Sequence, residues 1–437
     1  MRMFALCGVL VLSVPAFGQA PREAAAAKPP EKTIVVKAAR LIDGRSEQVR
    51  RNQAVLVVGQ RIREVGVADE VIRKAGQTQV VDLGDTTLLP GLIDNHTHVL
   101  LQGDITAGEY DEQLLKESTP YRTIRATVAA RTALMNGFTT IRDLETEGAM
   151  YADVDVKTAI QRGIIPGPRM YVVTRAMAPT GMYPLLGYSW ELRMPEGVQI
   201  VDGPDNARKA VREQVKYGAD WIKFYADRKY YWDEKKGRLA SWVNFTDEEA
   251  KALVDEAHRI GRKVAAHAIG WDGIDAALRA GADTIEHGDG LTDDLIDRAV
   301  KQNVYWCPTI YVGVYVAEGR GGVWPRMVEL EKQAFAKALR KHVRISFGTD
   351  AGGFAWSENQ AKEFGYMVRY GMTPMQAIQS ATTVAAALLG ESQNLGELSA
   401  GHLADVVAVD GDPLQDIGRL EHIRFVMKGG EIFKNER

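Results

Sequence analysis

Hydrophobic positions between residues 92 and 348 alternate between short apolar runs and longer segments with helical spacing. One helical segment begins with a capping box formed by Thr246 and Glu249, continues with apolar positions every three or four residues, and ends at Gly261. We count eight strand-then-helix units, with strand cores at 92–96, 138–142, 170–173, 221–225, 264–268, 284–287, 305–309 and 345–348.

Eight consecutive units predict an α/β fold, a (β/α)8 TIM barrel, whose chemistry is found at the carboxyl ends of the strands. A doubly wound open sheet is the alternative. It fits less well because no Gly-rich phosphate-binding sequence opens any of the predicted helices. We therefore assign residues 90–390 to a barrel and look for functional side chains where its strands end.

The two ends of this region have a different pattern, in which short runs of β-branched residues alternate with turn signals. Asp43-Gly44 is such a turn near the N-terminus, and residues 410–413 form another near the C-terminus. We predict that residues 32–89 and 391–437 together build one small β-sandwich domain.

The first residues of the chain have the features of an export signal. Arg2 is followed by an apolar stretch over residues 4–17, and small residues close the segment 1–20. We interpret 1–20 as a cleavable signal peptide and 21–31, rich in Ala, Pro, Lys and Glu, as a flexible leader. The expected location is the periplasm or the exterior, with no membrane span in the mature chain.

Composition narrows the class of function. The 437 residues are 46% hydrophobic and 25% charged, with a formal net charge of -3 and no basic run. These values are typical of globular proteins and argue against nucleic acid as a partner, so we expect a small-molecule substrate. Cys7 falls within the signal segment and leaves Cys307, expected to be a buried apolar residue, without a disulfide partner.

His96 and His98 are the first candidate functional residues. They stand two apart at the end of the first predicted strand, where the period of two directs both side chains to the same side. His267 and His287 end the fifth and sixth strands, and Asp350 follows the eighth. Imidazole and carboxylate groups are natural zinc ligands, so the five residues predict a metal site at the barrel mouth.

Lys223 lies on the fourth strand, where it is predicted to face the same interior. An ammonium beside metal ions would suffer both desolvation and repulsion. Reaction of the amine with carbon dioxide would form N6-carboxylysine, an anion whose two oxygens can bridge two ions. A lysine paired with a carboxylate elsewhere in the barrel is the alternative.

This arrangement resembles the amidohydrolase superfamily, and more narrowly its imidazolonepropionase-related branch, which includes Xaa-Pro dipeptidases and ochratoxin-hydrolysing amidohydrolases. The stretches that carry the resemblance, besides the His-x-His pair, are 218–223, 265–267 and 284–288, together with Asp350. The resemblance covers nearly the whole mature chain and includes the β-sandwich built from both termini.

The resemblance implies two divalent metal ions, with zinc as the default. His96, His98 and Asp350 would hold one ion, His267 and His287 the other, and carboxylated Lys223 would bridge them. A metal-bridged hydroxide would attack an amide carbonyl, and Asp350 would carry the proton to the leaving amine. Lys223, His287 and Asp350 are thus the candidate catalytic residues. Many relatives form homo-oligomers, often octamers.

We expect the substrate to be peptide-like, with release of a C-terminal amino acid, and hydrolysis of the ochratoxin A amide is compatible with this. The candidate contacts are Tyr225, Arg228, Lys229 and Tyr188, of which the two cations would hold a carboxylate. Packing of loop aromatics and solvated cations is an equal alternative. A hydrolase of cyclic amides or lactones, and a non-catalytic binding barrel, are the alternative functions.

Overall fold

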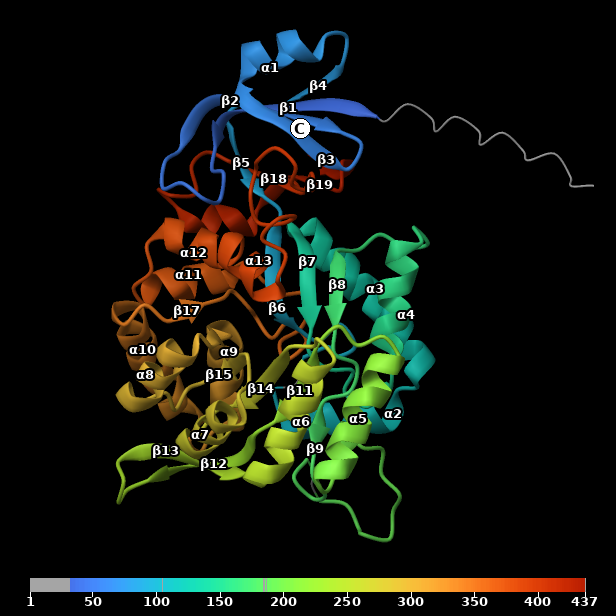
Figure 1. Cartoon of the computed structure of the whole chain (residues 1–437), viewed down its shortest axis with the longest axis vertical. Helices are drawn as coiled ribbons and strands as arrows, with labels where there is room; N and C mark the ends of the chain where they lie inside the picture. Colours follow the sequence, from blue (N-terminus) through green and yellow to red (C-terminus); the bar gives the residue numbers. More distant parts are fainter. Residues whose placement is uncertain (1–31, 104, 184, 186, 437) are drawn as a thin grey trace, which may run out of the picture. The chain divides into compact units, whose positions relative to one another are not determined.

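The computed structural model describes residues 32–103, 105–183, 185 and 187–436 (Figure 1). The predicted signal peptide, 1–20, and leader, 21–31, lie outside the described residues. No helix in the described part of the chain is long and apolar enough to cross a membrane.

A strand occurs at each of the eight positions predicted in the central region. They are β6 (Leu92–Thr97), β7 (Phe138–Asp143), β8 (Arg169–Val172), β11 (Ile222–Tyr225), β14 (Val264–Ala268), β15 (Thr284–His287), β16 (Tyr305–Cys307) and β17 (Arg344–Ile345). β16 and β17 are shorter than predicted. β16 stops before Thr309, because that residue adopts a left-handed backbone with φ 56°.

Helices follow these strands in order (Figure 1). They are α2 (Ala107–Lys116) and α3 (Thr119–Met135) after β6, α4 (Ala152–Gln161) after β7, α5 (Pro204–Lys216) after β8, α6 (Asp247–Arg259) after β11, α7 (Trp271–Ala280) after β14, α8 (Asp293–Gln302) after β15, α9 (Ile310–Arg320) and α10 (Trp324–Arg340) after β16, and α11 (Lys362–Arg369), α12 (Pro374–Ser380) and α13 (Thr383–Leu389) after β17. The capping box predicted at Thr246 and Glu249 is present at the start of α6.

The central strands pair in parallel, in two sheets. β6, β7 and β8 form one sheet; the other has the order β10 (Gln199–Ile200), β9 (Met177–Ala178), β11, β14, β15, β16, β17. Backbone hydrogen bonds continue across both gaps: Trp221 N donates to Val172 O over 3.2 Å, and Asn95 N to Phe347 O over 3.0 Å. The carboxyl ends of all these strands therefore lie close together.

The segment after β11 is a β-hairpin that sequence analysis described only as a loop. β12 (Asp227–Asp233) pairs antiparallel with β13 (Arg238–Val243). The turn between them places Gly237 at a positive φ of 59°, which glycine adopts without strain. Arg228 and Lys229 therefore lie on a strand.

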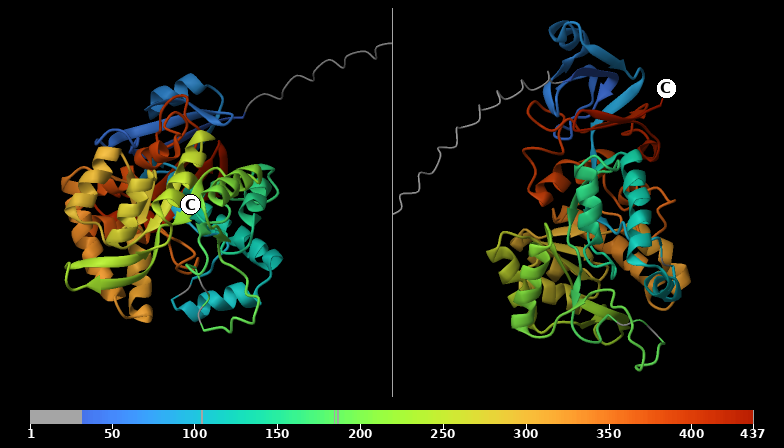
Figure 2. Two further views of the ribbon diagram at one scale, coloured as in Figure 1. Left: turned by 60° about the horizontal axis from the view of Figure 1, so that its bottom comes forward. Right: turned by 90° about the vertical axis from the view of Figure 1, so that its right-hand side faces the viewer.

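Strands from both ends of the chain form one further sheet, as the patterns predicted. Its order is β20 (Glu431–Asn435), β19 (Ile423–Lys428), β18 (Val406–Asp410), β5 (Thr86–Pro90), β1 (Thr33–Leu41), β2 (Arg50–Val58), β3 (Arg61–Val67), with β4 (Gln79–Asp82) beside β1. Helix α1 (Ala68–Ala75) and the 3-10 turn η1 (Ile417–Glu421) complete this region. In both views of Figure 2 the strands from the two termini lie side by side.

A β-sandwich built from both termini was predicted for this region, and its strands form one continuous sheet. Side chains from β1, β2, β18 and β19 nevertheless meet in one buried cluster, so the sheet folds over its own core. Val406 and Ala408 face that cluster, while Val407 and Val409 pack with the central core. Because successive side chains of a strand point to opposite faces, β18 contacts both clusters, and the terminal sheet packs against the central core.

Candidate active site

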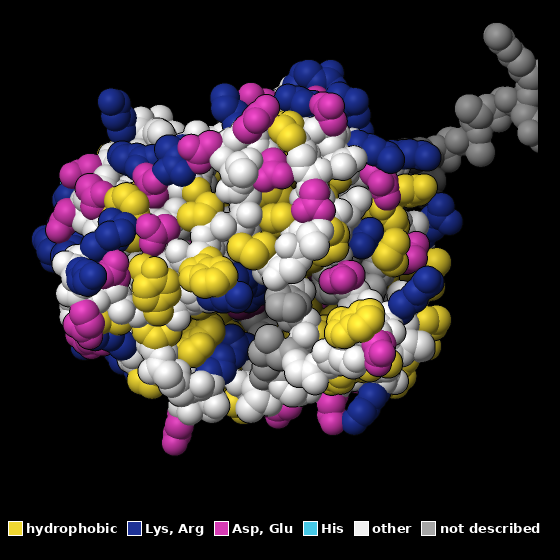
Figure 3. Space-filling model, turned by 90° about the horizontal axis from the view of Figure 1, so that it is seen from below, with side chains coloured by type: hydrophobic (Ala, Val, Ile, Leu, Met, Phe, Trp, Pro, Cys, Tyr) yellow, Lys and Arg dark blue, Asp and Glu magenta, His cyan; other side chains and the backbone are white. Residues whose placement is uncertain are grey.

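A cavity of about 550 Å³ opens at the carboxyl ends of the central strands. It is lined by all six residues predicted to hold metal ions: His96, His98, Lys223, His267, His287 and Asp350. Figure 3 views the molecule from below and shows Lys and Arg side chains among hydrophobic ones around the hollowed centre of this face. The fold therefore brings together side chains that are up to 254 positions apart, from 96 to 350.

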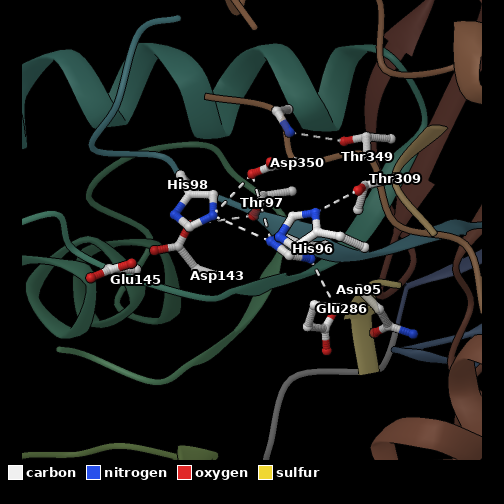
Figure 4. Close-up of polar contacts among 12 residues, drawn as sticks. Asn95, His96, Thr97, His98, Asp143, Glu145, Glu286, Thr309, Thr349 and Asp350 are labelled. Carbon is white, nitrogen blue, oxygen red and sulfur yellow. Dashed lines mark hydrogen bonds and ion pairs between the residues drawn. The ribbon is translucent and has the colours of Figure 1, made fainter. Parts of the chain in front are cut away.

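His96, His98 and Asp350 converge on one point (Figure 4). The Nε2 atoms of the two histidines are 3.4 Å apart, and Asp350 Oδ1 lies 3.0 Å from His98 Nε2 and 3.6 Å from His96 Nε2. Ligand atoms about 2.1 Å from a tetrahedral ion are themselves roughly 3.4 Å apart. The donor set therefore fits a divalent cation.

Asp350 is held at this point by an unusual backbone. Its φ is 60°, in the left-handed region, and its N–H donates to His96 O over 2.7 Å. Asp94 fixes the same loop, because its carboxylate accepts from the Thr349 hydroxyl at 2.6 Å and from the His96 N–H at 3.1 Å. Non-glycine residues in this region cost roughly 1–3 kcal/mol and persist where surrounding contacts impose them.

His287 and His267 form the other half of the cluster. Their ring centroids are 4.6 Å apart, and the His287 ring lies 4.9 Å from that of His96. His287 Nδ1 is hydrogen bonded to Thr309 Oγ1 at 2.9 Å, and His267 Nε2 to the Tyr230 hydroxyl at 2.6 Å. Nε2 of His287 and Nδ1 of His267 are therefore the nitrogens left for a metal.

Lys223 is 1% exposed and lies among these groups. Within the described residues its ammonium has no ion pair or hydrogen bond, and the Tyr225 ring lies 5.8 Å from Nζ. Burial lowers the pKa of Lys223, although Glu286, Glu145 and Asp350 oppose this shift. The alternative of a lysine paired with a carboxylate is not what the structure shows.

Burial also keeps three of the four histidines neutral, namely His96, His267 and His287. It lowers the pKa of His287 to about 4, and it brings those of His96 and His267 well below their usual range. For His98 burial acts in the same direction but is outweighed by Asp350 and Glu147, which raise its pKa to about 9. Neutral imidazole is the form that binds metal ions.

Two glutamates at this site were not predicted. Glu145 and Glu147 follow β7 and are buried. Glu145 accepts a hydrogen bond from the Tyr225 hydroxyl at 2.5 Å. Glu147 accepts one from the Tyr183 hydroxyl at 3.0 Å, and its carboxylate lies 3.5 Å from His98 Nδ1. The sequence did carry a signal, because acidic residues alternate at 143, 145 and 147 directly after an apolar strand.

Cys307 is buried, as predicted. Its sulfur, a His96 nitrogen and a Glu286 oxygen lie within 4.8 Å of one another. Burial and then Glu286 raise the pKa of the Cys307 thiol well above its usual range. A protonated thiol is a poor nucleophile.

Three of the four predicted substrate contacts line the cavity: Tyr225, Arg228 and Lys229. The Arg228 guanidinium lies over two aromatic rings, 4.2 Å from the Tyr183 centroid and 4.4 Å from that of Tyr225. Tyr188, the fourth predicted contact, is not among the residues that line the cavity. Its side chain is 43% exposed, because residues 187–192 project into solvent.

The amidohydrolase family model matches residues 87–433. This chain belongs to the amidohydrolase family. It is 29% identical to the ochratoxinase of Aspergillus niger, over 92% of this chain and 87% of that protein. It is also 22% identical to the imidazolonepropionase of Pyrobaculum arsenaticum, over 91% of this chain and 98% of that protein.

Among solved structures, this amidohydrolase resembles a Xaa-Pro dipeptidase with methionine bound in the active site. The TM-score is 0.82 and the identity 32%, covering 92% of this chain and all of the other. The predicted branch of the superfamily is therefore confirmed, and the chain is a hydrolase of amide bonds. Members of the family typically depend on metal, and the site contains groups suited to bind it.

Proposed function

We propose that this protein is a binuclear, metal-dependent amidohydrolase that releases a C-terminal amino acid from a dipeptide-like substrate. The observation that carries the proposal is the convergence of His96, His98 and Asp350 beside an unpaired, buried Lys223. Hydrolysis of N-acyl amino acids such as ochratoxin A fits the same chemistry. The similarity to ochratoxinase and to a Xaa-Pro dipeptidase supports it.

The residues divide into two ligand sets. His96, His98 and Asp350 would hold one ion, and His267 and His287 the other. Zinc suits these nitrogen and oxygen donors. Two bound divalent ions would supply a nucleophilic hydroxide at neutral pH and polarise the substrate carbonyl.

Lys223 is proposed to carry a carboxyl group, as N6-carboxylysine. The lowered pKa favours the neutral amine, the form that attacks carbon dioxide. The carbamate would be an anion. Among the described residues, Lys223 forms no ion pair that would hold it as an ammonium instead. It would thereby reverse the charge that Lys223 brings to the cluster and would contribute oxygen ligands to both ions.

Asp350 is proposed to move the proton. One carboxylate oxygen, Oδ1, faces His96 and His98, while Oδ2 points toward Gly353 at the cavity wall. The strained backbone of Asp350 fixes this orientation. Asp350 can therefore accept the proton of the attacking water and donate it to the leaving nitrogen, which an amide does not expel readily as an anion.

Arg228 is proposed to hold the substrate carboxylate. It lines the cavity, and stacking between Tyr183 and Tyr225 leaves the edge of its guanidinium plane, where the N–H donors lie, for a bidentate contact. Lys229 lines the same cavity and, although it packs over the Trp242 ring at 4.1 Å, adds positive charge. An enzyme that releases a C-terminal amino acid needs such a site.

Further parts of the proposal concern the whole molecule. The eight central strands would close into a (β/α)8 barrel, supported by the backbone hydrogen bonds of Trp221 and Asn95 across the two sheet gaps. Export to the periplasm or exterior is proposed from the pattern of residues 1–20. A homo-oligomer, possibly built as an octamer, is proposed from the family resemblance.

The test combines metal analysis with a screen of Xaa-Pro dipeptides, other amides of C-terminal amino acids, and ochratoxin A. We expect about two zinc ions per chain, chelator-sensitive turnover, and, for Asp350→Asn, at least partial metal retention with a loss of roughly 10²-fold or more in kcat. His422→Asn is the control, since this histidine lies outside the cavity lining. Full activity of the stripped enzyme or of Asp350→Asn would contradict the proposal.

A further inference from the structure

Two carboxyl groups in the wall of the cavity have no part in the chemistry described above. Asp289 follows β15 and Glu331 is on α10, and both line the cavity. They are 7% and 2% exposed. Gly313 on α9 lies against Glu331, since a Cβ built there would be 3.7 Å from Glu331 Oε2.

Neither carboxyl has a hydrogen bond or ion pair with another residue in the described part of the chain. Other buried carboxyls of this region are satisfied. Glu363 accepts the backbone N–H groups of Ile310 and Tyr311 at 2.9 and 2.7 Å, and Asp227 accepts that of Gly270 at 2.8 Å. The fold thus provides partners for these structural carboxyls but not, within the described residues, for Asp289 and Glu331 in the cavity wall.

Burial disfavours the charged form of both carboxyls and raises the pKa of Glu331 well above its usual range. Glu331 is therefore neutral in the absence of a cation, and a cationic group bound beside it would favour the ionised carboxylate.

We propose that Asp289 and Glu331 form a subsite for a cationic group of the substrate, so that the enzyme prefers amides bearing an ammonium or guanidinium group. This inference rests on the proposed amide hydrolysis in the same cavity. Two sources offer such a group: the free α-amino group of a dipeptide and the side chain of a lysine or arginine residue.

Aromatic side chains of the same cavity support a cationic ligand. Tyr230 and Trp324 both line it, with their rings edge to face at 6.2 Å between centroids. Arg320, which also lines the cavity, has its guanidinium 4.6 Å from the Trp324 centroid, so this wall already attracts one cation, and Tyr230 is the ring left for the alkyl stem of a basic side chain. With Arg228 holding a carboxylate elsewhere in the cavity, the site matches a substrate that carries both charges.

Four substrates separate the two sources: Ala-Lys, Ala-norleucine and the N-acetyl derivative of each. If the side chain is recognised, wild-type kcat/KM should be about tenfold or more higher for lysine than for norleucine; if the α-amino group is recognised, acetylation should cause that loss. Whichever of these two ratios of kcat/KM is large in the wild type, Glu331→Gln should reduce it to about threefold or less. Glu329→Gln, an exposed glutamate on the same helix, is the matched control and should preserve it.

Two results would overturn the subsite. One is a wild-type enzyme that hydrolyses all four substrates within about threefold of one another. The other is a Glu331→Gln enzyme that retains the wild-type ratios. Thermal unfolding gives a second readout, because replacing a buried carboxyl that has no partner by an amide of the same shape should not lower Tm. A lower Tm would mean that Glu331 has a structural partner and would contradict the inference.

Binding measurements distinguish a failed subsite from a failed function. If none of the four amides is hydrolysed by metal-loaded enzyme, the proposed hydrolysis of dipeptide-like amides is contradicted. Calorimetry with L-lysine, L-norleucine and N-acetyl-L-norleucine then tests the subsite alone. Tighter binding of a probe that carries the cation, lost in Glu331→Gln, supports it; equal binding of all three overturns it.

Discussion

The Nδ1 atom of His96 donates a hydrogen bond to Oε2 of Glu286 over 2.8 Å, with both side chains fully buried. The other carboxylate oxygen of Glu286 accepts from Arg142 Nη2 at 2.8 Å. This places the proton of the neutral imidazole on Nδ1 and leaves the Nε2 lone pair directed at His98 and Asp350. Arg142 thus acts on the proposed metal site through Glu286.

Glu286→Gln should therefore weaken metal binding without removing any ligand. An amide donates as well as accepts, so it no longer fixes the His96 tautomer, and it loses its charge pair with Arg142. Loss of such an orienting partner typically lowers metal affinity roughly 10- to 100-fold. Competition with a zinc-sensitive dye measures the change, and Asp283→Asn, a partly exposed neighbour on the adjoining turn, serves as control.

A variant of Lys223 tests the proposed carbamate directly. Protein prepared with ¹³C-bicarbonate and zinc should give a carbamate resonance by NMR that is absent from Lys223→Ala. Because the alanine variant would also lose the oxygens of the proposed carbamate, it should bind less than two ions per chain and lose most turnover. A wild-type spectrum without that resonance, in protein carrying two ions, would contradict carboxylation of Lys223.

Glu256 on α6 predicts a pH-dependent contribution to stability. Hydrogen bonds from Arg259 and then Arg212 lower the pKa of Glu256 to about 2 from its usual 4.5. A lowered pKa stabilises the folded state above pH 4.5, and this contribution is lost as the pH falls toward 2. Because both arginines are solvent-exposed, we expect Glu256→Gln to cost only about 1 kcal/mol at pH 7.

Chemical unfolding of wild type and Glu256→Gln at pH 7 and at pH 3 measures this difference. The gap between the two free energies of unfolding should shrink at the lower pH. Asp255→Asn is the matched control, because Asp255 forms an exposed pair with Lys251 at 2.9 Å on the same helix. A gap that stays constant between the two pH values would show that the loss is one of packing rather than of charge.

Phe347 is expected to be important for stability of the central core. It is fully buried, stacks on Phe138 at 5.5 Å between centroids and lies 4.3 Å from Phe364. Phe347→Ala should lower the free energy of unfolding by about 3–5 kcal/mol, through lost transfer energy and the cavity left behind. Phe347→Leu should cost less than half as much, and equal losses for both variants would argue against a cavity effect.

The periodicity of the chain determined most of the architecture. Apolar runs located all eight central strands because most of their residues are buried, and the alternation at both termini indicated strands that build one domain together. The spacing of His96 and His98 was sufficient, together with the placement of four other residues, to predict that all six side chains meet. Lys223 was placed on a strand, His267 and His287 at strand ends, and Asp350 after a strand. Side chains at the carboxyl ends of neighbouring parallel strands converge independently of the conformation of the loops that follow.

Loop conformations and buried partners were decided only by the tertiary structure. The hairpin carrying Arg228, the outward position of Tyr188 and the buried Glu145 and Glu147 depend on contacts between distant segments. The unpartnered state of Asp289 and Glu331 is of the same kind. A sequence shows which groups can ionise, but burial and the neighbours that satisfy or oppose each charge exist only once the chain has folded.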